Sequence, residues 1–114
     1  MYLNRKAIFD EILEERSRQI EKKGFSDSHD SKWSDGELAR AASVYAMPHE
    51  YREYVDTGFK LRPYEWPWSD DDYKPTPENR KKELIKAAAL IVAEIERLDA
   101  LEENLSRKLD SEES

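Results

Sequence analysis

The sequence predicts an all-α protein of three main helices, with a long aromatic and proline-rich loop packed across them. Apolar residues repeat at helical spacing near both ends of the chain, and no window alternates between apolar and polar residues as a half-buried strand does. A chain of 114 residues is long enough for one core and too short for two. We therefore expect one helical domain over residues 1–103 and an acidic, frayed tail over residues 104–114.

The first helix is predicted over residues 4–23. Its apolar residues fall on one face of the helix: Ile8, Phe9, Ile12, Leu13 and Ile20. Gly24 follows a pair of lysines, which is typical of a helix end.

The second helix is predicted over residues 34–46. Ser34 and Glu37 fit the capping-box pattern, in which the two side chains accept from the first backbone N–H groups of a helix. Pro48 disfavours helix at Met47, so we expect an end near Ala46, followed by a short helical piece over residues 49–55.

Residues 56–79 contain four of the five prolines and two of the three tryptophans. A loop of this length is either functional or disordered in most proteins. Its aromatic content is higher than disordered segments carry, so we expect it to pack on the helices.

The third helix is predicted over residues 78–103, after Thr76 as N-cap and Pro77 at the first helical position. Apolar residues then repeat with steps of four and three, from Leu84 to Leu98. Further apolar residues widen this stripe, which favours contact with more than one neighbour. We therefore expect a homodimer or a larger homo-oligomer.

The composition excludes several classes of protein. There are no cysteines, and so no disulfides or thiolate zinc sites. With 26 acidic and 19 basic residues the net charge is −7, which argues against general binding of duplex nucleic acid. No apolar run is long enough to cross a membrane or to form a signal peptide, so a cytoplasmic location is expected.

Charged residues in two places suggest binding chemistry. Arg16 and Gln19 share a helix face and offer donors to a phosphate or a base edge, unless Arg16 pairs with a Glu of another helix. Basic residues at the start of the third helix break the dipole preference for acids there, which indicates a bound anion or neutralisation by residues 70–72. These basic residues are Arg80, Lys81, Lys82 and Lys86.

Acidic residues and histidine offer weaker candidates. Two i, i+3 carboxylate pairs, Glu11 with Glu14 and Glu96 with Asp99, have the spacing for a hard cation such as Mg²⁺ or for an ordinary solvated face. The loop pair His29 and Asp30 fits either a proton-transfer site or a polar surface loop.

Aromatic residues gather around the loop. Trp66, Trp68 and Tyr73, with Tyr45 of the second helix, provide either a stacking platform for nucleobases or material to complete a small core.

Three segments of the chain resemble a known family. Glu15-Arg-x-Arg-Gln19, Gly36-Glu-Leu-Ala-x-Ala-Ala42 and the run from Lys86 to Asp99 are similar to small phage-encoded proteins. More distantly, the chain resembles the phage MazG-like nucleoside triphosphate pyrophosphohydrolases. That resemblance implies an all-α, oligomeric, Mg²⁺-dependent nucleotide enzyme, placed in the host cytoplasm if the protein is phage-encoded.

One departure from the MazG pattern changes the expected function. Those enzymes carry paired carboxylates on neighbouring helices, whereas the second helix here has Arg40 where the second acid would stand. An arginine repels a metal and attracts a phosphate. We therefore expect non-catalytic binding of a nucleotide or nucleotide-derived signal, as a phage anti-defence sponge, with no catalytic residue, metal ligand or cofactor assigned.

Two alternatives remain open: an Mg²⁺-dependent pyrophosphohydrolase, and a protein-binding adaptor that uses the Trp-rich loop. For the binding function, phosphate contacts are predicted from five basic residues, stacking from three aromatic residues and reading of the base edge from one amide. In chain order these ligand contacts are Arg16, Gln19, Arg40, Tyr45, Trp66, Trp68, Lys74, Arg80 and Lys86.

Overall fold

The computed structural model describes residues 4–23, 36–56, 58 and 61–113. As predicted, the protein is mostly helical. Its elements are α1 (Arg5–Lys23), α3 (Glu37–Ala46), a 3₁₀ turn (His49–Tyr51), β1 (Tyr54–Asp56), β2 (Leu61–Pro63), a second 3₁₀ turn (Asp70–Asp72) and α4 (Arg80–Glu113). Both α1 and α3 pack on α4.

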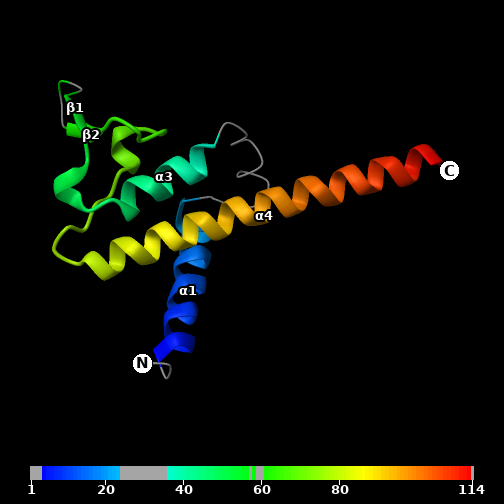
Figure 1. The fold of residues 1–114 in the computed structure, drawn as a ribbon, viewed down its shortest axis with the longest axis horizontal. Coiled ribbons are helices and arrows are strands. Elements are labelled where there is room, and N and C mark those ends of the chain that lie inside the picture. The colour runs from blue at the N-terminus through cyan, green and yellow to red at the C-terminus, as the bar shows by residue number, and fades with distance from the viewer. Residues whose placement is uncertain (1–3, 24–35, 57, 59–60, 114) are drawn as a thin grey trace.

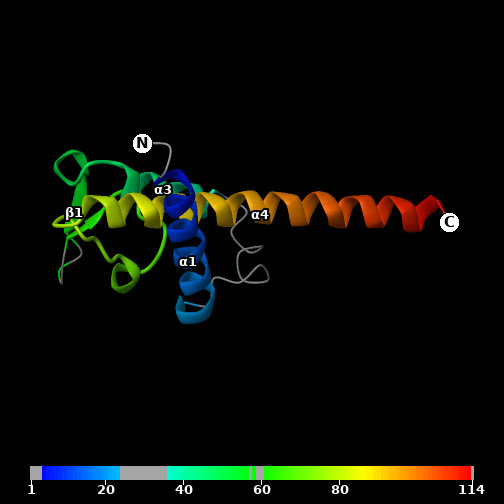
Figure 2. The ribbon, with the colours of Figure 1, turned by 90° about the horizontal axis from the view of Figure 1, so that it is seen from below.

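The arrangement is that of a long helix with a small body at one end (Figure 1). α3 lies beside the first half of α4, with the β-hairpin on the far side of α3. α1 crosses α4 steeply, and the second half of α4 projects alone beyond the other elements. The turned view in Figure 2 shows the same projection. None of the helices within the described residues combines the length and the apolar content that crossing a membrane requires.

The core lies between α3, α4 and the aromatic loop. Small residues on both helices allow their backbones to approach closely, and two aromatic rings from the loop close the end of the interface. The core residues are Leu38, Ala41, Ala42, Val44, Tyr45, Trp66, Tyr73, Ala87, Leu90 and Ala93. The expectation that the loop packs on the helices is therefore confirmed.

α3 begins differently from the prediction. Its N-cap is Gly36, with φ of +83° and no side-chain hydrogen bond to the cap, so the predicted capping box is wrong. Glycine adopts this left-handed conformation without a Cβ clash. Ser34 lies outside the described residues. The predicted end of the helix at Ala46 is confirmed.

The chain after Pro48 contains strands that the sequence analysis did not predict. The expected helical piece over residues 49–55 is a single 3₁₀ turn, and β1 then pairs antiparallel with β2, with Val55 opposite Arg62. Each strand has only three residues, which is too short for an alternating pattern to emerge.

α4 starts later and ends later than predicted. The Asn79 side chain accepts from the Lys82 backbone N–H at 3.1 Å, which is N-cap geometry, so the predicted cap at Thr76 is wrong. The helix continues to Glu113, where a frayed tail was expected. Leucines at positions 105 and 109 continue the apolar stripe beyond the predicted end at residue 103.

A fully buried ion pair ties the loop and the helices together. Both terminal nitrogens of Arg52 donate to the Glu83 carboxylate, at 2.9 and 3.1 Å, and neither side chain is more than 1% exposed. Arg52 also donates to the Tyr73 hydroxyl and to the backbone oxygens of Tyr45 and Met47. Each charge of this pair is thus matched by several partners, as a low dielectric requires.

Neighbouring groups keep both members of this pair ionised. Burial by itself raises the pKa of Glu83, but hydrogen bonds from Arg52, from the Thr76 backbone N–H and from Arg80 outweigh burial and lower it. Burial likewise opposes charge on Arg52, yet its bonds to Glu83 and Tyr73 raise the pKa of the guanidinium.

Glu83→Gln is expected to lower the free energy of unfolding by about 3–5 kcal/mol, because it leaves Arg52 as a buried charge without a counter-charge. Urea denaturation measures the loss. Glu50→Gln, in the exposed 3₁₀ turn, is the matched control and should change stability by less than about 0.5 kcal/mol. A loss no larger than that of the control would contradict the assigned role of the pair.

The same pair predicts a pH dependence of stability. The pKa of Glu83 is lower in the folded state than its ordinary value of 4.5. The ionised Glu83 carboxylate therefore stabilises the folded protein fully above pH 4.5, and this contribution is lost as the pH falls through the folded-state pKa. Urea midpoints of the wild type and Glu83→Gln should therefore converge on acidification below pH 4.5. A constant difference down to pH 2 would contradict this linkage.

Candidate ligand-binding site

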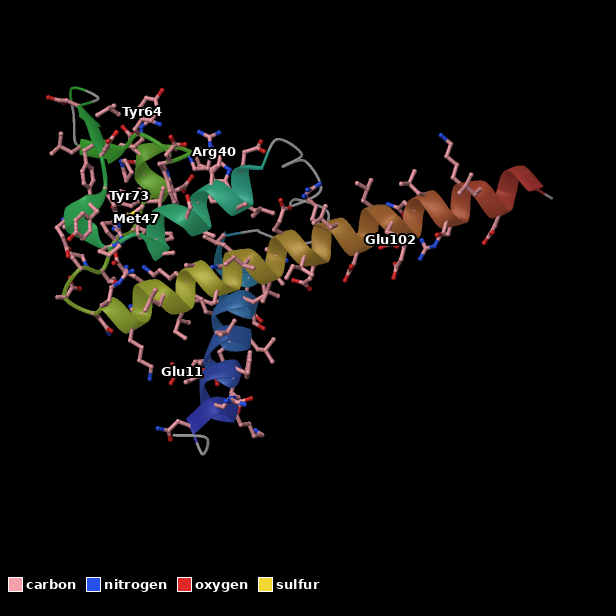
Figure 3. The ribbon with its side chains drawn as sticks, viewed as in Figure 1. Glu11, Arg40, Met47, Tyr64, Tyr73 and Glu102 are labelled. Carbon is pink, nitrogen blue, oxygen red and sulfur yellow. The ribbon has the colours of Figure 1, made fainter. Side chains whose placement is uncertain are left out.

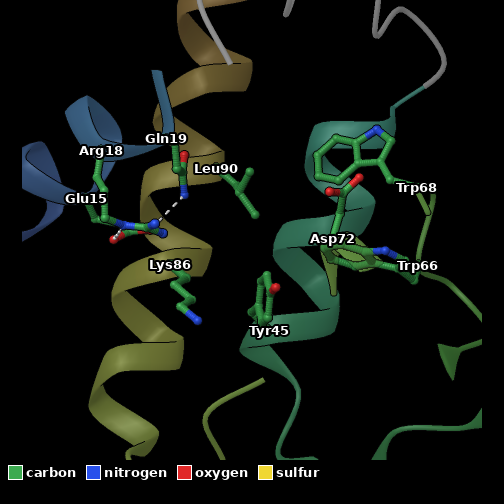
Figure 4. A pocket seen from close by; sticks show the side chains of 9 residues that line it. All are labelled: Glu15, Arg18, Gln19, Tyr45, Trp66, Trp68, Asp72, Lys86 and Leu90. Atoms are coloured by element: carbon green, nitrogen blue, oxygen red, sulfur yellow. Dashed lines mark hydrogen bonds and ion pairs between the residues drawn. The ribbon is translucent and has the colours of Figure 1, made fainter. Parts of the chain in front are cut away.

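A narrow hollow lies between α1, α3, α4 and the aromatic loop (Figure 4). We name it the Gln19 pocket. Its lining residues are Glu15, Arg18, Gln19, Tyr45, Trp66, Trp68, Asp72, Lys86 and Leu90. Its volume of about 10 Å³ is room for about one water molecule.

Gln19 provides the most informative polar atom of the pocket. One helical turn separates it from Glu15, and its amide nitrogen donates to the Glu15 carboxylate at 3.4 Å. Its carbonyl oxygen Oε1 is buried and accepts no hydrogen bond from any residue that the structure describes. A buried acceptor without a donor costs about 1–3 kcal/mol, so such an atom calls for an explanation.

The acid and base beside Gln19 neutralise each other. Arg18 donates to both oxygens of Glu15, at 2.7 and 2.5 Å, in a fork geometry. This hydrogen bonding outweighs burial and raises the pKa of Arg18. Glu15 and Arg18 therefore form a fixed polar side of the pocket, in which each charge is bound to the other rather than open to a ligand.

Tyr45 lines the pocket, and both its ring and its hydroxyl make contacts within the protein. Its ring stacks on Tyr73 with centroids 6.0 Å apart, and the ammonium of Lys86 lies 5.5 Å from its centroid. Its hydroxyl accepts from the Lys74 backbone N–H at 2.9 Å. Burial raises the pKa of Tyr45 to about 12, so the phenol is neutral at physiological pH.

Lys86 brings a positive charge to the pocket from α4. Its ammonium donates to the backbone oxygen of Lys74 at 2.6 Å, and the residue is only 7% exposed. An ammonium has three donors. Lys86 therefore places an ammonium at the pocket, with the Lys74 backbone oxygen as one of its acceptors.

The two tryptophans differ in burial. Trp66 is 3% exposed and belongs to the core, so for this ring completion of the core is what the structure shows. Trp68 is half-buried and packs edge-on against Trp66, with centroids 5.4 Å apart. Trp68 is thus the least buried of the three aromatic rings in the pocket.

Five of the predicted ligand contacts line this one pocket: Gln19, Tyr45, Trp66, Trp68 and Lys86. The other four do not line it. Arg16 donates to Glu96 of α4 at 2.7 Å, which is the internal pairing that the sequence analysis held open. Arg40 belongs to α3 and is labelled in Figure 3; its Nε lies 3.7 Å from the Glu65 carboxylate, and Lys74 is exposed.

Arg80 has a structural role in the described contacts. It donates to the backbone oxygens of Tyr45, Ala46 and Met47 at the C-terminal end of α3, where a positive charge is favourable. The neighbouring Lys81 contacts Glu11 at 3.4 Å. Of the acidic residues 70–72, Asp70 pairs with Arg62 at 2.8 Å rather than with this basic cluster.

The carboxylate pairs lie apart from one another. Glu11 contacts Lys81 and Glu96 contacts Arg16, and no group of three or more His, Asp or Glu side chains gathers within the described residues. His29 and Asp30 lie outside the part of the chain that the structure describes.

Four lining residues were not predicted as ligand contacts: Glu15, Arg18, Asp72 and Leu90. The spacing of Glu15, Arg18 and Gln19 by three and four was a usable signal, because such residues share a helix face. Asp72 stands in an acidic triplet without distinguishing pattern, and Leu90 reads as an ordinary core residue.

A second hollow of about 280 Å³ lies between α3 and the hairpin. We name it the hairpin groove. Its lining residues are Ser43, Val44, Met47, Tyr51, Arg52, Glu53, Pro63, Tyr64 and Glu65. Three large side chains on its rim, Met47, Tyr51 and Tyr64, are strongly exposed, and Figure 3 labels two of them near the hairpin.

Comparison of the chain with protein-family models, with curated proteins and with solved structures found no match.

Gln19→Met is expected to raise the free energy of unfolding of the ligand-free protein by roughly 1 kcal/mol, because it replaces a buried acceptor that lacks a donor by an apolar side chain of similar size. Urea denaturation measures the change. A loss of more than about 1 kcal/mol would show that Oε1 is satisfied in solution.

Proposed function

We propose that the protein binds a nucleotide or nucleotide-derived signal in the Gln19 pocket, without turning it over, and so removes the signal from solution. The observation that carries this proposal is the buried Oε1 of Gln19, an acceptor left without a donor among the described residues, in a pocket lined by three aromatic rings and by acidic and basic side chains. An exocyclic amine or a ring N–H of a nucleobase supplies such a donor. In a phage-encoded protein, this sequestration acts as a sponge against a host defence signal.

The charges of the pocket favour a ligand with few phosphates. The lining contains two acids, Glu15 and Asp72, and two bases, Arg18 and Lys86, and Glu15 already binds Arg18. One lysine suits a single anionic group rather than a polyphosphate. A nucleoside monophosphate or a cyclic nucleotide therefore fits this set of charges better than a triphosphate does.

Entry of a base requires a side chain to move, because the hollow has room for about one water molecule. Trp68 is the side chain that we propose moves, since it is the least buried ring of the lining. The Tyr45 ring already stacks on Tyr73 and lies next to the Lys86 ammonium. Stacking on the base therefore falls to Trp68.

Titration calorimetry with nucleosides and with mono-, cyclic, di- and triphosphates tests the proposal. We expect a nucleoside monophosphate or cyclic nucleotide to bind, and Lys86→Met and Gln19→Met each to weaken it. Loss of one charge-assisted hydrogen bond costs about 1.5–3 kcal/mol, or roughly ten- to more than a hundredfold in affinity.

Arg40→Ala is the matched control, because Arg40 also carries positive charge but lies outside the pocket. It should leave the affinity unchanged. Thermal melting of each variant separates loss of binding from loss of folding. If no nucleotide of the panel binds, or if Arg40→Ala weakens binding as much as Lys86→Met does, the proposed site is wrong.

The pyrophosphohydrolase alternative predicts release of pyrophosphate from a nucleoside triphosphate with Mg²⁺ or Mn²⁺. It needs several carboxylates converging on the triphosphate, and the two candidate pairs engage Lys81 and Arg16 instead. Turnover that is abolished by mutating a carboxylate would replace the sponge proposal with this one.

The adaptor alternative is favoured by a specific observation, although on a different surface from the Trp-rich loop. Trp66 is in the core, whereas the hairpin groove presents three exposed large side chains around a hollow of about 280 Å³. Such a rim is typical of sites that bind a protein segment. Loss of a captured host protein on Tyr64→Ala, without loss of nucleotide binding, would support this second function.

The predicted homo-oligomer also remains a proposal. Large apolar side chains are exposed on α1 and along α4. Monomeric proteins rarely expose contiguous apolar surface of this kind.

A further inference from the structure

The exposed face of α4 has the pattern of a coiled-coil seam. Its large apolar residues are spaced by three, four or seven positions, and each is about half exposed: Leu84, Ile91, Ile95, Leu98, Leu105 and Leu109. We name this set the α4 stripe. No described residue covers its second half, since every residue from 101 to 110 is exposed and this part of α4 projects alone (Figure 1).

Such spacing places the residues of the stripe at the a and d positions of a heptad repeat. Ile95 and Leu109 are then a residues, as is Glu102, while Leu98 and Leu105 are d residues. The flanking g positions are Glu94, Leu101 and Lys108, and one flanking e position is Asp99. We propose that a second copy of this chain covers the α4 stripe and that the two α4 helices are antiparallel. In the proposed register, Ala100 of one copy and Ala100 of the other lie at the same height along the helix axes.

The residues of the seam disfavour parallel pairing of the two α4 helices. In register, parallel helices place a opposite a, so the Glu102 carboxylates of the two copies face each other inside the seam. Figure 3 labels Glu102 on the projecting part of α4. Parallel pairing also brings Glu94 against Asp99 of the second copy on both edges, which adds like-charge repulsion.

The antiparallel register removes these conflicts. Each a residue then lies opposite a d residue, so Glu102 meets Leu98 of the second copy, and Ile95 meets its Leu105. On one edge, Glu94 of each chain comes level with Lys108 of the other. The Glu94 side chain is 17% exposed and bound to Arg97 of its own chain, so Lys108 joins an existing ion pair, and opposite charges attract. The one like-charged contact, between the two Asp99 residues, lies on the outer edge in water, where screening weakens it.

The register also accounts for Leu101, which lies off the stripe and is 49% exposed. In the antiparallel pair the two Leu101 side chains meet at the two-fold axis and cover each other. The same surface patch is used by both copies, as a two-fold symmetric dimer requires.

Light scattering at tens of micromolar tests whether a dimer forms. We expect the mass of a dimer for the wild type, a monomer for Leu98→Ser, and a dimer for the matched control Arg107→Ser on the opposite face of α4. Leu98 is 49% exposed, so its replacement should leave the thermal melt of the small body intact. A wild-type monomer, or a dimer that Leu98→Ser leaves unchanged, overturns the proposal.

Charge reversal tests the direction. Glu94→Lys faces Lys108 in the antiparallel pair and should raise the dimer dissociation constant by roughly two- to tenfold, and adding Lys108→Glu should restore it. In the parallel pair Glu94→Lys would face Asp99 and strengthen the dimer. Recovery in the double variant also separates the effect from loss of the Glu94 contact with Arg97 within the chain.

Cross-linking gives an independent readout of direction, because the chain has no cysteine of its own. With a short bifunctional maleimide, Leu101→Cys should form covalent dimers and Glu102→Cys should not. The reverse result identifies a parallel pair and overturns the proposed register.

Discussion

The buried contact between Arg52 and Glu83 is the constraint on which the rest of the body depends. A charged pair with no access to water is tolerated only when each charge finds several partners, so the surrounding chain must be held in one arrangement. Arg52 satisfies this by donating to Glu83, to the Tyr73 hydroxyl and to the backbone oxygens at the end of α3. Glu83 in turn accepts from the Thr76 backbone N–H. One pair therefore fixes α3, the aromatic loop and the start of α4 together.

The geometry of the candidate pocket depends on this ion pair. Because Tyr73 is held by Arg52, it forms a fixed surface against which the Tyr45 ring stacks, and Tyr45 in turn lies beneath Lys86. α1 then brings Gln19 to the open side, fixed on α4 by the neighbouring Arg16 and its contact with Glu96. The burial that makes these contacts rigid also leaves the Gln19 oxygen without a donor, at a cost in stability that a ligand with an N–H group would repay.

The helices were predictable from the sequence, since the periodicity of α1 and α4 and the end of α3 before Pro48 depend on local residues. The hairpin was not, because three-residue strands carry no alternation. The end of α4 was predicted ten residues too early, at residue 103, because Glu102 interrupts the apolar pattern without ending the helix. Five pocket residues were predicted from their chemistry, but Arg16 and Arg80 bind acids and backbone oxygens of other elements. Pairing between distant parts of the chain has no local signature, so residue type alone could not separate a structural cation from a ligand contact.

The central claim is that the Gln19 pocket holds a small nucleotide-type ligand. Mass spectrometry of small molecules released on denaturing protein purified from its natural cellular setting tests it most directly. The account predicts a nucleotide-derived compound in near-stoichiometric amount from the wild type, and its loss from folded Lys86→Met. Wild-type protein that releases no such compound, or folded Lys86→Met that still releases it in full, would contradict the account.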